Sequence, residues 1–313
     1  VETDNNPAPA GGRVRWVEGK GGAPIRTAVW PNPDGGRGTM FVLPGKSEYI
    51  EKYFEVVGEL LARGFSVVVL DWRGQGLSHR EVDHPTKAFI GRFEDFLDDF
   101  EAVFDLHSKE LQGPWYSLAH SMGGNVLLRL AGEHRIPFEA IAMTAPMTGL
   151  NMPPFWEKTA EVVVQSAVGF GAGDLFIPGA SSYDPLVEDF ENNSVTSDPV
   201  RHARTAAIVQ ALPQIAQGGA TYAWIHEAFK SIKVIARPEF GRGIRIPVLI
   251  LGAADDRLVD PVTNRYVGVN IPGAEFHMVD GAKHEILMER DPLREIFWTY
   301  FDDFMARVTA QAA

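Results

Sequence analysis

The stretch Trp115-Tyr116-Ser117-Leu118-Ala119-His120-Ser121-Met122-Gly123-Gly124 contains the turn around which the rest of the chain is organised. It begins with a short apolar and aromatic run, which is typical of a buried strand. The residues from Asn125 to Ala131 are mostly apolar and predict a helix that follows directly. Ser121 therefore lies where the chain turns from a strand into a helix.

A turn of this kind is tight, so the residues two positions before and two positions after its serine must be small. Ala119 and Gly123 meet that requirement. The arrangement is that of a nucleophile elbow, which holds a serine hydroxyl clear of the sheet. The usual pattern has glycine in the first of the two positions, and alanine is a mild departure. A serine that only caps the next helix gives the same short pattern, so the rest of the chain has to decide.

Length and composition indicate one large soluble domain, or one domain with an insertion. The chain has 313 residues, of which 45% are hydrophobic and 22% are charged. Its net charge of −12 disfavours nucleic acid and anionic membrane surfaces as partners. The absence of cysteine excludes disulfides, thiolate metal sites and cysteine nucleophiles. No apolar run approaches the length needed to span a membrane, so we expect no stable membrane insertion.

Strands alternate with helices along most of the chain. Besides the run that begins at Trp115, strands are predicted over residues 13–18, 25–30, 39–43, 66–70, 138–144, 247–251 and 274–279. The first two of these form an antiparallel pair, and a last helix is predicted over residues 292–308. This alternation predicts an α/β fold with a mostly parallel sheet that is covered by helices on both faces.

The alternation is interrupted after the sixth strand. Three stretches between residues 147 and 243 are helix-like, over 156–168, 199–212 and 221–235, and the residues over 169–173 and 178–198 indicate loops. We therefore predict a flexible N-terminal arm over 1–12, a core formed by 13–146 and 244–313, and a helical cap over 147–243.

A serine hydroxyl needs a base that removes its proton, and the base is commonly a histidine oriented by a carboxylate. In a doubly wound sheet such groups follow the C-terminal ends of strands. His284 follows the last predicted strand, and both Asp255 and Asp256 follow the strand before it. The order Ser, Asp, His is the one expected of an α/β-hydrolase.

Several short stretches carry a family resemblance. They are Leu43-Pro44-Gly45, Asp71-Trp72-Arg73-Gly74-Gln75-Gly76-Leu77-Ser78, His120-Ser121-Met122-Gly123-Gly124, Asp256-Arg257-Leu258-Val259 and Gly281-Ala282-Lys283-His284-Glu285. With them the chain resembles the lysophospholipase and monoacylglycerol-lipase branch of the α/β-hydrolases, often labelled serine aminopeptidase-like hydrolases. The resemblance implies that Ser121 is the nucleophile and His284 the general base and acid. Asp256 would orient the histidine, because the family's aspartate directly precedes the Arg-Leu-Val stretch, and Asp255 is the alternative.

The resemblance also implies two backbone N–H donors for the oxyanion, those of Met122 and Lys46. The family usually has His-Gly where this chain has Pro44-Gly45. A backbone donor at Lys46 survives that change. The Lys46 side chain could bind an acidic group, although a solvated lysine is the simpler interpretation.

Other residues near the expected site have competing interpretations. We interpret His120 as structural, with a side chain directed into the sheet, although it neighbours the nucleophile. Apolar side chains of the cap would pack onto the core or line an acyl pocket. We expect Gly45, Met147, Trp156 and Trp224 to contact the substrate.

We predict no metal ion and no nucleotide, and hence no cofactor. The remaining histidines show no paired spacing with acids that would indicate a metal site. The Gly-x-Gly stretches do not follow a strand and open a helix in the dinucleotide-binding pattern.

The expected partner is a small acyl ester, and the sequence leaves the oligomeric state open. A cytoplasmic location is expected, although a chain that starts at valine leaves a removed signal sequence possible.

The leading hypothesis is therefore a serine carboxylic-ester hydrolase that acts on single-acyl-chain lipids, either lysophospholipids or monoacylglycerols, through an acyl-enzyme. A general esterase, a lactonase or an aminopeptidase or amidase could use the same residues. A non-catalytic binding protein is a more remote alternative, because such proteins typically have a broken triad.

Overall fold

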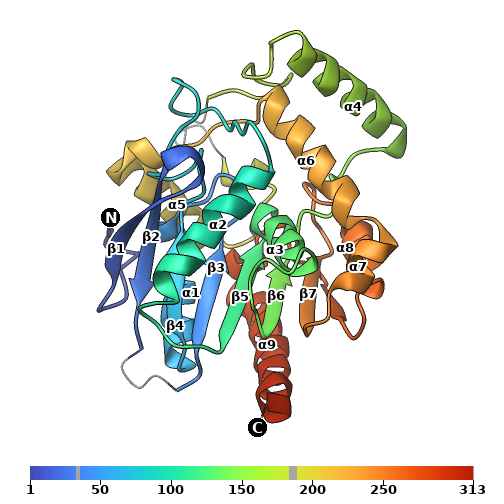
Figure 1. The fold of residues 1–313 in the computed structure, drawn as a ribbon. Helices are drawn as coiled ribbons and strands as arrows, with labels where there is room; N and C mark the ends of the chain where they lie inside the picture. The colour runs from blue at the N-terminus through green and yellow to red at the C-terminus, as the bar shows by residue number, and fades with distance from the viewer. Residues whose placement is uncertain (33–35, 183–188, 313) are drawn as a thin grey trace.

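A sheet of eight strands forms the centre of the computed structural model, which describes residues 1–32, 36–182 and 189–312 (Figure 1). The order of the strands across the sheet is β1-β2-β4-β3-β5-β6-β7-β8. Their bounds are β1 Arg13–Glu18, β2 Pro24–Trp30, β3 Thr39–Leu43, β4 Ser66–Leu70, β5 Trp115–His120, β6 Ala140–Thr144, β7 Val248–Ala253 and β8 Glu275–Val279. The α/β class predicted from the sequence is confirmed.

Strands β3 to β8 run parallel to one another, and β1 and β2 are antiparallel, as predicted. The register aligns the C-terminal ends of the central strands. Leu43 lies opposite Ala119, and His120 lies opposite Thr144, which lies opposite Leu251. Loops that leave these strands therefore start from the same edge of the sheet.

Helices cover both faces of the sheet because alternate strand residues point to opposite sides. In β3, Phe41 and Leu43 belong to one apolar core, and Met40 and Val42 belong to the other. The first core lies under α2 (Glu94–His107) and α3 (Met122–Gly132), and the second lies under α1 (Phe54–Ala62) and α9 (Asp291–Ala312). Figure 1 shows the two layers on opposite sides of the strands.

The segment between β6 and β7 contains α4 (Pro154–Gly169), α5 (Pro199–Ala211), α6 (Tyr222–Ile235) and α7 (Pro238–Gly243). The first three agree with the helix-like stretches of the sequence to within two residues. Figure 1 shows α4 and α6 beyond one end of the sheet, where α4 packs along α6. The loop predicted over 178–198 includes 183–188, which lie outside the described residues. Helix α8 (Pro261–Val269), between β7 and β8, is not predicted.

The expected arm, residues 1–12, lies against the core instead of extending from it. The amide of Asn6 donates to the Glu51 carbonyl at 2.8 Å, and the N-terminal ammonium contacts the Glu51 carboxylate at 2.9 Å. The indole N–H of Trp30 donates to the Pro9 carbonyl at 2.9 Å. These partners lie far along the chain, and the polarity of residues 1–12 does not reveal them. The flexibility of this arm stays a prediction.

None of the helices in the described residues combines the length and the apolar character needed to cross a membrane.

Candidate active site

Ser121 occupies the turn between β5 and α3 with φ 49° and ψ −116°. A positive φ is uncommon for a residue other than glycine and costs conformational energy. Hydrogen bonds hold the turn in place, since the Ser121 N–H donates to the Thr144 carbonyl at 3.1 Å and the Met147 N–H donates to the Ser121 carbonyl at 2.8 Å. A Cβ at Gly123 would lie 2.2 Å from the Leu43 carbonyl oxygen, which explains the demand for a small residue there.

The three residues expected to form the triad meet at the C-terminal edge of the sheet. The Ser121 Oγ and His284 Nε2 are 2.9 Å apart, although 163 residues separate them in the chain. The His284 Nδ1 lies 2.6 Å from the Asp256 Oδ2. With Nδ1–H donated to the carboxylate, the histidine presents an unprotonated Nε2 that accepts the serine hydroxyl proton. All three side chains are buried.

Asp256, and not its neighbour, is the carboxylate in contact with the histidine. Its Oδ1 accepts the backbone N–H groups of Leu258 at 2.8 Å and Val259 at 2.9 Å, which fixes the carboxylate plane. Burial alone would raise the pKa of Asp256, but the bonds from His284 and these two amides lower it overall. The side chain therefore stays ionised beside the imidazole. Asp255 is exposed.

The loop that carries Lys46 lies next to the serine. A Cβ on Gly45 would lie 3.2 Å from the Ser121 Cβ, so the loop passes close to Ser121. Within the described residues, neither the Lys46 N–H nor the Met122 N–H donates a hydrogen bond to another protein group. These two amides are therefore free to bind an anionic oxygen, as the resemblance implies.

The Asp71–Ser78 stretch holds this loop in place. The Gln75 amide donates to the carbonyls of Gly45 at 2.9 Å and Glu48 at 3.2 Å, and its oxygen accepts the Ser47 N–H at 3.1 Å. The Trp72 indole donates to the Pro44 carbonyl at 2.8 Å. This stretch, one of those that carry the family resemblance, thus positions the loop, and within the part of the chain that the structure describes it donates no hydrogen bond to Ser121, His284 or Asp256.

A cluster of buried charges lies behind the loop, and the sequence analysis missed it. The Glu48 carboxylate accepts the Gly45 N–H and the Tyr53 hydroxyl. The Lys52 ammonium bridges Glu48 at 3.0 Å and Glu285 at 2.6 Å. Burial opposes ionisation of Glu48, but Lys52 and these hydrogen bonds lower its pKa to about 2. The signal for this cluster in the sequence was the spacing of Glu48 and Lys52, which lie four residues apart shortly after Gly45, as in a helical ion pair.

His120 is buried between this cluster and His284. Its Nδ1 lies 3.1 Å from both the carbonyl and the hydroxyl of Thr144, and its ring centroid lies 4.7 Å from that of His284. Burial lowers the pKa of His120 to about 4, although Glu48 opposes the shift. A neutral imidazole in this position packs against His284 and adds no charge to it.

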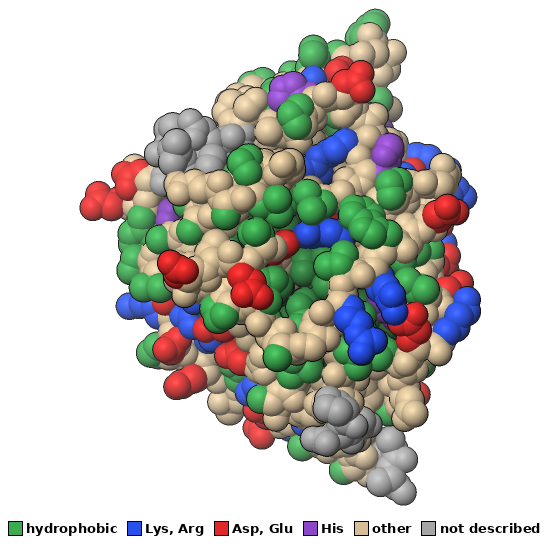
Figure 2. Space-filling model, turned by 90° about the vertical axis from the view of Figure 1, so that its left-hand side faces the viewer, with side chains coloured by type: hydrophobic (Ala, Val, Ile, Leu, Met, Phe, Trp, Pro, Cys, Tyr) green, Lys and Arg blue, Asp and Glu red, His purple; other side chains and the backbone are tan. Residues whose placement is uncertain are grey.

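A cavity of about 740 Å³ opens above Ser121 and His284. Residues from both the core and the 147–243 segment line it, and many of them are apolar, among them Met147, Leu150, Val195, Val209, Ala220, Trp224, Ile225, Leu258 and Val259. Figure 2 shows a face of the molecule where hydrophobic side chains gather around a central hollow, with lysine or arginine side chains at its edge. The volume suits a ligand that has a substantial apolar part.

The four residues expected to contact substrate occupy different places. Met147 and Trp224 line the cavity. Gly45 lies in the loop beside Ser121, outside the cavity lining. Trp156 lies on α4 with 56% of its surface exposed, and it contacts Phe155 instead of the cavity. Its position differs from the expectation because α4 packs along α6 and keeps this end of its surface in solvent.

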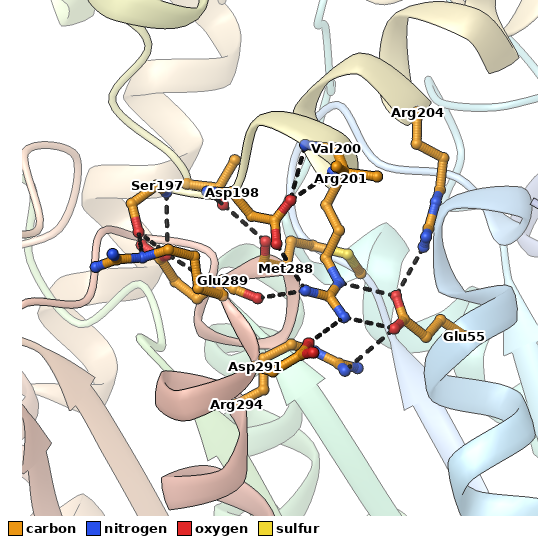
Figure 3. Close-up of polar contacts among 12 residues, drawn as sticks. Glu55, Ser197, Asp198, Val200, Arg201, Arg204, Met288, Glu289, Asp291 and Arg294 are labelled. Atoms are coloured by element: carbon orange, nitrogen blue, oxygen red, sulfur yellow. Dashed lines mark hydrogen bonds and ion pairs between the residues drawn. The ribbon is translucent and has the colours of Figure 1, made fainter. Parts of the chain in front are cut away.

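An ion-pair network joins the 147–243 segment to the core (Figure 3). The Arg201 guanidinium of α5 binds the Glu55 carboxylate of α1 at 2.6 and 2.9 Å and Asp291 at 2.8 Å. Arg204 and Arg294 contact the same carboxylate at 2.7 and 3.2 Å. Three guanidinium groups thus converge on Glu55. Burial alone would raise the pKa of this carboxylate, but the three guanidinium groups outweigh burial and lower the pKa to about 2.

A second set of contacts ties the same segment to the loop that carries His284. The buried Glu289 carboxylate accepts the N–H group of Ser197 at 3.0 Å (Figure 3). It also accepts the N–H group of Lys283 at 2.9 Å. The Glu285 N–H donates to the Val195 carbonyl at 2.8 Å. The residues on both sides of His284 are therefore held by hydrogen bonds from their backbone N–H groups. Lys283 donates to the Glu289 side chain, and Glu285 donates to the Val195 carbonyl.

A serine bonded to a histidine that a buried aspartate orients, at the edge of a mostly parallel sheet, defines a serine hydrolase of the α/β-hydrolase class. Residues 35–291 match the family described as serine aminopeptidase, S33 (Hydrolase_4). The chain belongs to this family.

Curated relatives and solved structures agree with this assignment. The chain is 32% identical over 282 residues to lysophospholipase L2 of Escherichia coli, a match that covers 86% of this chain and 80% of that protein. It is 28% identical over 263 residues to the probable lysophospholipase L2 of Haemophilus influenzae, with 82% and 80% covered. A soluble variant of monoglyceride lipase from Saccharomyces cerevisiae shares the fold, with a TM-score of 0.73, 19% identity and 98% and 99% of the two chains covered.

Proposed function

We propose that the protein is a serine carboxylic-ester hydrolase that acts on single-acyl-chain lipids, lysophospholipids or monoacylglycerols. The observation that carries the proposal is the hydrogen-bonded series Ser121, His284 and Asp256 at the base of a largely apolar cavity. The names of the relatives, lysophospholipase and monoglyceride lipase, support the same substrate class.

In the first half of the reaction, Ser121 Oγ attacks the ester carbonyl while His284 Nε2 takes its proton. Negative charge develops on the carbonyl oxygen, and the N–H groups of Met122 and Lys46 bind it. Asp256 stabilises the imidazolium that forms. The tetrahedral intermediate then collapses, and His284 gives its proton to the departing glycerol oxygen, which leaves the acyl group on Ser121.

In the second half, His284 removes a proton from water as the water attacks the acyl-enzyme carbonyl. The same two amides bind the second oxyanion. The intermediate expels Ser121 Oγ, which recovers its proton from His284, and a fatty acid leaves. No cofactor takes part in this sequence.

The charges of the cavity favour an ester substrate over an amine-bearing peptide. An aminopeptidase needs a free carboxylate to receive the substrate's ammonium group. Glu285 is the one carboxylate among the described residues that line the cavity, and Lys52 already pairs with it at 2.6 Å. Burial raises the pKa of Glu285 despite this pairing, which weakens it further as an amine receptor.

We propose that residues 147–243 act as the cap of this site, because this segment supplies much of the cavity wall. It contributes Met147, Val195, Thr205, Val209 and Trp224 to the lining. An acyl chain held there would gain about 0.8 kcal/mol for each buried CH₂ group. The cytoplasmic location stays a prediction.

A substrate panel tests the proposal. We expect 1-palmitoyl-lysophosphatidylcholine and 1-palmitoylglycerol to have kcat/KM values at least about tenfold above that of p-nitrophenyl acetate, because apolar burial accumulates along the chain. Proline p-nitroanilide should be a poor substrate. Ser121→Ala, checked for folding by circular dichroism, should lose about 10⁴-fold or more in kcat. Retained turnover by this variant, or a preference for the anilide, would refute the assignment.

A further inference from the structure

The side chain of Lys46 turns into the active-site cavity instead of out to solvent. Its Nζ donates to the Ser47 hydroxyl at 2.8 Å and to the Gly218 carbonyl at 3.3 Å, and it lies 5.7 Å from the centre of the Trp224 ring. All of these residues line the cavity. Lys46 therefore presents an ammonium group to the same space as the nucleophile.

This ammonium has no counter-ion among the described residues, since none of their carboxylates lies within ion-pair distance of it. The second lysine of the cavity differs, because Lys52 is paired with both Glu48 and Glu285. A cation removed from water without a partner is costly, and its burial lowers the pKa of Lys46 to about 8. At neutral pH the side chain is still mostly charged, so an anionic group brought into the cavity would be stabilised there.

The length of the Lys46 residue limits how far a bound anionic group can lie from the reacting carbonyl, because the Lys46 backbone N–H lies at the carbonyl and its ammonium lies at the anionic group. The Lys46 N–H is one of the two proposed oxyanion donors, so its side chain starts from the position of the scissile ester. In a 1-acyl-glycerophospholipid the three glycerol carbons separate the acylated oxygen from the phosphate oxygen. The four-carbon stem of a lysine spans a comparable length. One residue can therefore contact both ends of the glycerol unit.

We propose that the Lys46 ammonium binds the phosphate of a single-chain glycerophospholipid whose acyl ester lies at Ser121. Lys46 is then a specificity-determining residue that favours lysophospholipids over monoacylglycerols. The inference rests on the proposed ester hydrolase function. It also agrees with the contacts of Nζ to two neutral oxygens, neither of which carries a charge that would balance the ammonium.

The test compares two substrates with the same acyl chain, 1-palmitoyl-lysophosphatidic acid and 1-palmitoylglycerol, on the full chain. The measured quantity is the ratio of their kcat/KM values. Lys46→Met should lower this ratio about tenfold or more, the loss expected for a charge-assisted hydrogen bond. Any general damage to the oxyanion loop cancels in the ratio. Lys46→Arg should keep the ratio within about threefold, because a guanidinium also binds phosphate.

The matched control is Lys233→Met, which removes one positive charge from the exposed side of α6. Lys233 pairs with Glu161 at 2.6 Å and lies outside the cavity lining. Its ratio should equal that of the wild type. An equal fall in Lys233→Met and Lys46→Met would attribute the effect to overall charge and overturn the inference.

Inhibition distinguishes a lipid phosphate from free phosphate. Glycerol 3-phosphate should compete with 1-palmitoylglycerol in the wild type, and Lys46→Met should weaken this inhibition about tenfold. One outcome would indicate a free-anion site and overturn the inference. Inorganic phosphate would inhibit as strongly as glycerol 3-phosphate, and the ratio of the two kcat/KM values would be unchanged in Lys46→Met. Failure of the proposed function is separate, because the wild type would then hydrolyse neither lipid. Hydrolysis of both lipids with an unchanged ratio in Lys46→Met refutes the phosphate contact alone.

Discussion

Ser121 combines a reactive position with a costly backbone conformation. Its φ of 49° falls in the region that favours glycine. The neighbours hold it there through the backbone bonds to Thr144 and Met147, and the Leu43 carbonyl oxygen, 2.2 Å from where a Cβ on Gly123 would lie, leaves room for glycine two residues later. The strain is therefore stored at the residue whose hydroxyl must stand clear of the sheet.

This strain predicts an order of stability between two inactive variants. Ser121→Gly and Ser121→Ala both remove the hydroxyl, but only glycine adopts the positive φ without a Cβ penalty. We expect Ser121→Gly to be more stable than Ser121→Ala by about 1 kcal/mol. Urea denaturation followed by circular dichroism would measure the difference. Equal midpoints, or a less stable glycine variant, would argue against stored strain.

At the scale of single residues, the sequence predicted which side chains meet but not how their surroundings are charged. Ser121, Asp256 and His284 come together because each lies in the turn or loop that follows a strand of one sheet, in its parallel part. The Lys46 side chain was expected in solvent. Its direction depends on Gly218 and Trp224, which are remote in the chain, and no local pattern encodes that contact.

At the scale of elements, α5 is joined to the core through charged groups. Glu55 of α1 receives three guanidinium groups, two of them from α5 and one from α9 (Figure 3). The same helix supplies Thr205 and Val209 to the cavity wall. The position of this wall thus depends on the ionisation of one partly buried carboxylate.

Acid should weaken this attachment. The pKa of Glu55 falls from an ordinary 4.5 to about 2 on folding, so the folded state binds its proton less readily than the unfolded state does. The stability it contributes is present above about pH 4.5 and is lost as the pH falls toward 2. Glu55→Gln should lower the free energy of unfolding at pH 7 and make it depend less steeply on pH between 5 and 3. Urea denaturation at several pH values would measure both effects.

Glu59 provides the control, one turn along the same helix and 2.6 Å from Arg294. Burial raises its pKa despite Arg294, so its contribution to stability changes with pH in the opposite direction. Glu59→Gln should therefore leave the acid-induced loss of stability at least as steep as in the wild type. If the two variants flattened the profile equally, Glu55 would not be the group responsible.

Helices and strands with a clear local pattern, such as a capping residue, an apolar stripe or a short apolar run, were predicted from the sequence, and the helix without one was missed. Helices α5 and α6 begin after Asp198 and Thr221, whose side chains cap them, and their starts were predicted within one residue. Helix α8 was missed because its buried residues are Asn264, Val267 and Gly268, which form no apolar stripe. The strands of the sheet core were easier to predict, since each is a short apolar run between turns.

At the scale of the whole molecule, the fold joins residues that are far apart in the chain into one site under a wall supplied by an insertion. The site depends on the parallel sheet, which aligns the ends of β3, β5, β6 and β7 at one edge. The insertion supplies much of the apolar wall, and of the two lysines that line the cavity, Lys46 is the one without a carboxylate partner among the described residues. The whole chain carries a net charge of −12, so the Lys46 ammonium has the opposite sign to the overall charge of the molecule.

The central claim is that Ser121 is the nucleophile activated by His284, and covalent labelling tests it most directly. The protein would be treated with an alkyl fluorophosphonate, and peptide mass spectrometry and residual activity on 1-palmitoyl-lysophosphatidylcholine would be followed together. We predict one label, on Ser121, that forms in step with the loss of activity, and much slower labelling in His284→Asn. Full activity with Ser121 completely labelled, or inactivation with the label on another residue, would contradict the account.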